Sequence, residues 1–182
     1  IKQGTWIDQL TRVIAVLGVS MPIFWIALIL VSTFYTRLGW LPGPQGRLPI
    51  VFSDPPHVTG LFTVDSLLDG DTETFWAATK QLILPVLTIG LISMAPIARM
   101  TRATMIEALN SDYVRTAKAK GLAPRPVLYR HSLKNALIPV ITVIGFQLGG
   151  LMGSAAVVEV VFGLNGVGNT LLQGIFNRDY PL

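Results

Sequence analysis

The sequence has no cysteine, little histidine and few charged residues. Of its 182 residues only His57 and His131 are histidines, and 13% are charged. The absence of cysteine excludes disulfide bonds and thiolate metal sites, and two distant histidines are too few for a metal cluster. With 51% apolar residues and a mean hydropathy of +0.57, the composition instead indicates a membrane protein.

A nucleotide-binding lysine is also missing. The segment GLNGVGNT at 163–170 differs from the pattern G-x-x-x-x-G-K-[ST] at one position, where Asn169 replaces lysine. The ammonium group that reaches the outer phosphates is therefore absent. We interpret the segment as a glycine-rich turn after a membrane helix, in which the glycines supply backbone angles that other residues resist.

Three apolar stretches are long enough to cross a membrane, at about 13–35, 81–98 and 137–158. The first has 23 residues without a charge, which at about 1.5 Å per residue spans a hydrocarbon core of roughly 30 Å. Pro22 in its middle predicts a kink. The predicted fold class is therefore all-α: a polytopic helical membrane protein with about three transmembrane helices in a single domain over 1–182.

The distribution of charge predicts the orientation of the spans. Residues 99–134 carry eight Lys or Arg and two acidic residues, whereas 36–80 carry three Lys or Arg and five acidic residues. By the positive-inside rule the 99–134 loop is cytoplasmic, and the 36–80 loop and the 159–182 segment are external. The cytoplasmic loop is predicted to form a helix, a break at 121–124 and a second helix, and its basic residues also suit anionic lipid headgroups.

Several segments resemble the permease subunits of bacterial ATP-binding-cassette importers, in particular the dipeptide, oligopeptide and nickel group. They are DYVRTAKAKGL at 112–122, RHSLKNALIPVIT at 130–142 and VVEVVFGLNGVGNTLLQGIFNRDYP at 157–181. In that family a cytoplasmic loop, the EAA loop, carries a short coupling helix that docks on the ATPase subunit. Arg115, Thr116 and Ala117 stand at its Glu-Ala-Ala positions, and Gly121 stands at its glycine.

This resemblance implies a transport subunit of the bacterial inner membrane, and not an enzyme. It implies a second permease subunit, two ATPase subunits that bind and hydrolyse ATP, and an extracytoplasmic substrate-binding protein. No cofactor, metal or nucleic acid is expected on the chain itself, and surrounding lipid is its other partner. Further spans are expected on either side of the sequence. Dipeptide, oligopeptide, nickel and glutathione remain open as substrates.

The resemblance and the residue types together suggest three groups of site residues. The expected ATPase-coupling surface lies within 115–128, and Gly145, Gly149 and Gly153 recur at a spacing that lines one helix face for close packing. Gln147 and Glu159 are candidates for the translocation pathway or a gate, since polar groups at membrane depth are functional candidates. For Gln147 a hydrogen bond to a neighbouring helix is the preferred interpretation, and no metal site is expected. The coupling residues are Arg115, Ala117, Lys118, Gly121, Leu122, Ala123, Pro124 and Leu128.

Two other functions are weighed against this one. An ATP-independent channel or secondary transporter is compatible with helices interrupted by Pro22, Pro85 and Pro96. A membrane-embedded enzyme would need a polar catalytic cluster at depth, and the predicted spans contain no histidine or aspartate. The long match at 112–142 favours the ATP-driven permease.

Overall fold

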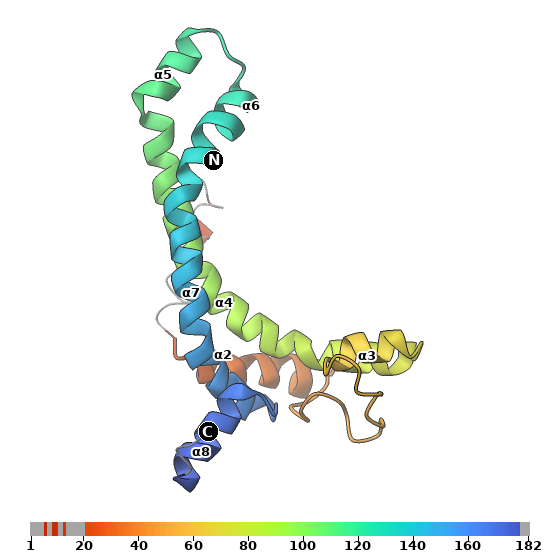
Figure 1. Ribbon diagram of the computed structural model, residues 1–182. Helices are drawn as coiled ribbons and strands as arrows, with labels where there is room; N and C mark the ends of the chain where they lie inside the picture. Colours follow the sequence, from red (N-terminus) through yellow and green to blue (C-terminus); the bar gives the residue numbers. More distant parts are fainter. Residues whose placement is uncertain (1–5, 7–8, 11–12, 14–20, 179–182) are drawn as a thin grey trace. The chain divides into compact units, whose positions relative to one another are not determined.

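The described part of the chain is helical throughout. The computed structural model describes residues 6, 9, 10, 13 and 21–178 (Figure 1), and no strand occurs among them. This confirms the predicted all-α fold. The helices are α2 (Ile23–Leu30), the π-helix η1 (Val31–Arg37), α3 (Phe62–Leu68), α4 (Thr72–Asn110), α5 (Asp112–Ala119), α6 (Pro124–Pro126), the π-helix η2 (Val127–Leu133), α7 (Lys134–Phe162) and α8 (Val167–Asn177).

The chain forms two compact units. The first unit comprises Met21–Leu91 and Leu151–Leu182, and the second comprises Ile1–Ser20 and Ile92–Gly150. Because α4 and α7 both run from one unit into the other, each unit contains one part of each long helix.

Apolar contacts between three helices hold the first unit together. Ala27 of α2, Leu84 of α4, and Val158 and Phe162 of α7 form its buried cluster. Pro22 lies in an extended conformation immediately before α2, as its N-cap, so it precedes this helix instead of kinking it. Residues 14–20 of the predicted first span lie outside the described residues.

A tight reversal in the first unit joins α3 to α4 (Figure 1). Gly70 has φ +77°, a conformation that glycine adopts at little cost. The Asp71 N–H donates to the Ser66 carbonyl at 2.9 Å. The Asp71 carboxylate then accepts the N–H groups of Glu73 and Thr74 at 3.1 and 3.0 Å, and thereby caps the start of α4.

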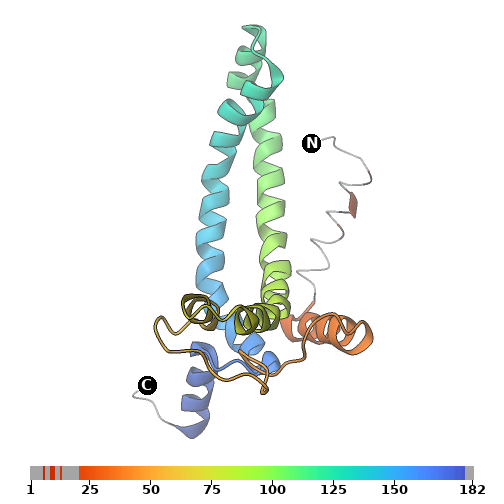
Figure 2. The same ribbon diagram turned by 90° about the vertical axis from the view of Figure 1, so that its right-hand side faces the viewer.

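In the second unit, the C-terminal part of α4 and the N-terminal part of α7 lie side by side and antiparallel (Figure 2). Met105 and Ala108 of α4 pack with Ala136 of α7. The connection between these helices has a small core of its own, which includes Val114 and Val127. The predicted sequence of helix, turn and helix is therefore present, and it is a packed element.

The long helices extend beyond the predicted spans. Thr72–Asn110 and Pro124–Leu151 are long and apolar enough to cross a membrane. With 39 residues, α4 is roughly 58 Å long. It extends beyond the apolar stretch because the polar residues at both of its ends also have high helix propensity. Gly153–Phe162 and Val167–Asn177 qualify as a third span only as a pair bent by 91°, which would be a broken span or a re-entrant loop. This bent pair includes much of the 159–182 segment that was predicted to be external.

Candidate functional site

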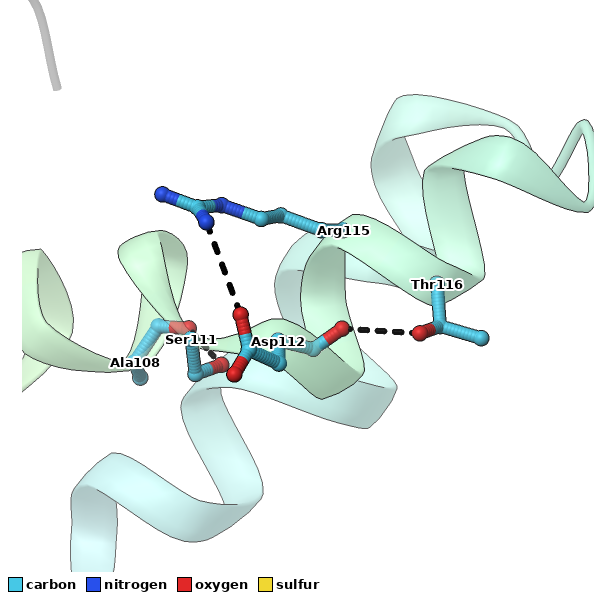
Figure 3. Close-up of polar contacts among 5 residues, drawn as sticks. All are labelled: Ala108, Ser111, Asp112, Arg115 and Thr116. Atoms are coloured by element: carbon cyan, nitrogen blue, oxygen red, sulfur yellow. Dashed lines mark hydrogen bonds and ion pairs between the residues drawn. The ribbon is translucent and has the colours of Figure 1, made fainter.

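The loop expected to contact an ATPase begins at Ser111, the single residue between α4 and α5, where several polar contacts gather (Figure 3). The Ser111 hydroxyl donates to the Ala108 carbonyl at 2.6 Å, which satisfies an acceptor in the last turn of α4. Asp112 opens α5, where its carboxylate lies 3.5 Å from the Arg115 guanidinium and its carbonyl accepts the Thr116 hydroxyl at 2.9 Å. This ion pair is exposed and contributes little to stability, so Arg115 remains available to a partner.

Gly121 ends α5 in a Schellman motif. Its φ is +78°, and its N–H donates to the Lys118 carbonyl at 3.0 Å while the Leu122 N–H donates to the Ala117 carbonyl at 3.3 Å. These two bonds satisfy carbonyls at the end of the helix. No atom lies within 4 Å of the position that a Cβ on Gly121 would take. Backbone conformation, and not lack of space, therefore requires glycine here.

The turn presents a continuous exposed surface. All residues from 118 to 126 are exposed, including Leu122 at 42%. Lys118, Lys120 and Arg125 give this surface a positive charge, and none of the three has an ion-pair partner within the described residues. We call residues 118–126 the turn surface.

Two of the predicted coupling residues face inward. Ala117 belongs to the buried cluster with Val114 and Val127, and Leu128 packs against the cluster of Met105 and Ala108. These side chains support the loop from within. The predicted residues that a partner can reach are Arg115, Lys118 and the turn from Gly121 to Pro124.

A second site residue, Glu159, lies against the start of α8. Its Oε2 accepts the N–H of Asn169 at 2.6 Å. Gly166, the N-cap residue of α8, has no side chain that could serve this amide. Glu159 therefore satisfies one of the free donors at the helix start and places a negative charge at the positive end of the helix dipole. The contact links the two arms of the bent pair.

Two glycines allow this close contact. A Cβ on Gly166 would overlap the Glu159 carboxylate, and one on Gly168 would overlap the backbone of Ala156. The predicted reason for the glycines, an unusual backbone angle, applies to Gly163, whose φ is +67°. It does not explain Gly166 and Gly168. Gly168 is required by close approach to the Ala156 backbone, whereas a side chain at position 166 would have to displace the flexible end of Glu159.

The same contact bears on the resemblance to a phosphate-binding loop. A phosphate in such a loop binds at the N-terminus of the following helix. In this chain the Glu159 carboxylate occupies the start of α8, and it would repel a second anion. The sequence alone did not reveal this contact, because the carboxylate comes from the preceding helix. The pattern that could have indicated the contact is a carboxylate seven residues before a glycine N-cap.

The small-residue stripe on α7 is open. No atom lies within 4 Å of a Cβ built on Gly145, Gly149 or Gly153. Gln147 is half-buried, and its amide has no hydrogen-bond partner among the described residues. The close helix packing and the amide bond that the sequence suggests are therefore not formed within the described part of this chain.

The loop between η1 and α3 is organised by one buried carboxylate that the sequence did not single out. Asp65 accepts the Thr59 hydroxyl and N–H, each at 2.7 Å, and the Gly60 N–H at 2.9 Å. Led by the Thr59 hydroxyl, these bonds lower the pKa of Asp65 below its ordinary value near 3.8. Elsewhere in the loop, Arg47 donates to the Asn165 carbonyl at 2.6 Å, which ties the loop to the turn before α8.

Comparisons with known proteins agree on one family. The model of the binding-protein-dependent transport system inner membrane component matches residues 1–182. The dipeptide transport system permease protein DppB of Alkalihalophilus pseudofirmus is 47% identical over 184 aligned residues, which cover all of this chain and 54% of that protein.

Other relatives carry related names. The di/tripeptide transport system permease protein DppB of Pseudomonas aeruginosa is 45% identical, over all of this chain and 54% of its own length. The glutathione transport system permease protein GsiC of Escherichia coli is 37% identical, over 99% of this chain and 49% of its own length. The chain spans about half the length of the curated relatives it matches.

Proposed function

Since the chain belongs to the family of binding-protein-dependent transport system inner membrane components, we propose that it forms part of the translocation path of an ATP-driven peptide importer. The relatives' names concern dipeptides, di/tripeptides and glutathione, which are short peptides with charged ends. Peptides are therefore the proposed substrate class. The permease catalyses no reaction itself.

The turn surface is the proposed contact with an ATPase subunit, and it is the observation that carries the mechanism. It is exposed, basic and held in one conformation by the Gly121 turn and the core beneath it. A rigid element of this kind can transmit a movement, because packed helices shift between discrete arrangements. ATP binds to the ATPase subunits, and when these two subunits close on ATP they move the loop.

The remaining partners complete the importer. A second permease subunit supplies the other half of the path, and the open glycine face of α7 is a surface on which one of its helices could pack closely. A substrate-binding protein docks on the extracytoplasmic side, formed by the 36–80 loop and the region around α8. Gln147 and Glu159 are proposed to act in the pathway or its gate, Glu159 through its hold on α8.

Cysteine crosslinking can test the coupling contact directly, because residues 1–182 contain no cysteine of their own. A single cysteine replaces Ala123 in the full-length permease, the candidate ATPase carries a single cysteine in its docking groove, and crosslinking is measured with and without ATP. We expect a crosslink whose yield depends on nucleotide. A cysteine at Ala103, which is exposed on α4 outside the turn surface, is the matched control.

Failure of the Ala123 crosslink in an assembled complex would reject the docking assignment. Peptide uptake by reconstituted vesicles supplies the second readout. If uptake persists without ATP and without the ATPase subunit, the chain is part of a channel or secondary transporter.

A further inference from the structure

A groove in the first unit combines aromatic, proline and charged side chains. It is an open groove of about 530 Å³ between the 42–52 loop and the first turns of α4, a volume in the range of small-ligand sites. Pro42, Pro49 and Phe52 line it from the loop, and Glu73, Trp76 and Lys80 line it from the helix. The three helix residues share one face of α4, because they are spaced three and four apart.

The two charges in this groove are unpaired. Neither the Glu73 carboxylate nor the Lys80 ammonium has an ion-pair or hydrogen-bond partner within the described residues. Both residues are exposed, so a ligand can reach their side chains. Asp71 lines the adjoining hollow beside Glu73, and the hydrogen bonds that it accepts, first from the Thr74 side chain, lower its pKa. One end of the groove is therefore negative and the other is positive.

The separation of the charges fits a short peptide. Glu73 and Lys80 are seven residues apart, which is about 10.5 Å along the helix. An extended peptide spans about 3.5 Å per residue, so two or three residues cover roughly 7 to 10 Å. The flexible side chains of Glu73 and Lys80 reach toward both ends of such a chain.

We propose that this groove binds a zwitterionic di- or tripeptide, with its ammonium at Glu73 and its carboxylate at Lys80. Trp76 and Phe52 supply apolar surface for the peptide's side chains. The groove adjoins α4 just before the apolar stretch 81–98, so it would hold peptide at the extracytoplasmic entrance of the path. The orientation and the peptide class rest on the proposed function.

The test measures peptide binding directly, without ATP. Full-length permease complex in nanodiscs, free of binding protein, is titrated with dialanine, trialanine and pentaalanine, and with N-acetylated and C-amidated trialanine. Di- and trialanine should bind with affinities that fall as salt rises. Blocking either terminus should weaken binding about two- to fivefold, because each removes one exposed charge pair. Pentaalanine should bind no better than a blocked peptide, since only one of its ends can be paired.

Substitutions assign each terminus to its partner. Glu73→Gln should weaken trialanine and leave N-acetyl-trialanine unchanged, whereas Lys80→Gln should weaken trialanine and leave the amidated peptide unchanged. Asp69→Asn and Arg37→Gln are the controls, because both residues are exposed charges that do not line the groove, and both variants should bind like the parent.

Three results would overturn the proposal. The first is no peptide binding by a complex that still performs ATP-driven uptake with its binding protein. The second is peptide binding that neither substitution changes. The third, from a parallel titration of the same variants with the binding protein, is a loss of binding-protein affinity with peptide binding unchanged. The last result would assign the groove to a protein contact. Because binding is measured without ATP, each result is separable from failure of the proposed transport function, which would appear as uptake independent of the ATPase.

Discussion

Replacement of Gly121 tests whether the shape of the turn surface matters. A side chain at this position meets no atom within 4 Å, so Gly121→Ala adds no clash, and its cost comes from φ +78° alone. A left-handed conformation costs a non-glycine residue about 1 to 2 kcal/mol. That cost corresponds to a factor of about 5 to 30 in the equilibrium between the closed and the opened turn.

Hydrogen exchange at Gly121 and Leu122 measures this opening, because both amides donate to carbonyls of α5. We expect protection to fall by up to the same factor in Gly121→Ala, to fall further in Gly121→Val, and to fall least in Gly121→Asn, since asparagine tolerates this conformation. The nucleotide-dependent crosslink at Ala123 should weaken in the same order. Equal protection in all three variants would refute the assigned turn, and lost protection with an undiminished crosslink would refute its role in docking.

Three further perturbations address the other regions. Glu159→Gln keeps a hydrogen-bond acceptor for the first turn of α8 but removes the charge, and should lower the stability of that turn by about 0.3 to 1 kcal/mol. Glu159→Ala removes the acceptor as well and should lower it further. Hydrogen exchange over 167–171 distinguishes the two variants, and equal exchange in both would contradict the capping role. Gly168→Ala should lower the stability by about 1 to 3 kcal/mol, because the added Cβ would overlap the backbone of Ala156. Gly149→Ala is the control and should leave the melting temperature of the isolated subunit unchanged. Similar melting temperatures of the two variants would contradict the close contact at Gly168. The lowered pKa of Asp65 means that its contribution to stability is complete above about pH 4 and is lost as the pH falls through the folded-state value; proteolysis of the 58–61 loop should accelerate there, and Asp65→Asn should be cut quickly at every pH.

The sequence predicted features that depend on local pattern. The apolar stretch 81–98 correctly located α4. It could not give the ends of the helix, because the apolar residues stop at Lys80 and Arg99 whereas residues with high helix propensity continue on both sides. Similarly, Gly121 marked the end of α5, since a glycine after a helical segment is a local signal.

Features that depend on contacts distant in the chain were not predictable in this way. The position of Glu159 at the start of α8 requires the chain to bend by 91° between them, and nothing in the periodicity of 137–158 indicates that bend. The burial of Asp65 depends on a loop that folds back to offer three donors. The groove at Glu73 and Lys80 depends on prolines some thirty residues earlier. In each case the decisive partner lies outside the window in which hydrophobic patterns are read.

The contact between Glu159 and Gly166 also constrains how this protein can evolve. Any residue larger than glycine at position 166 would displace the carboxylate, and loss of the carboxylate removes the reason for keeping that position small. A larger residue at position 166 should therefore appear mainly in descendants of this sequence in which position 159 has lost its carboxylate. Such paired replacement would be visible in a sufficiently deep set of related sequences, as a record of the bend kept independently of any substrate.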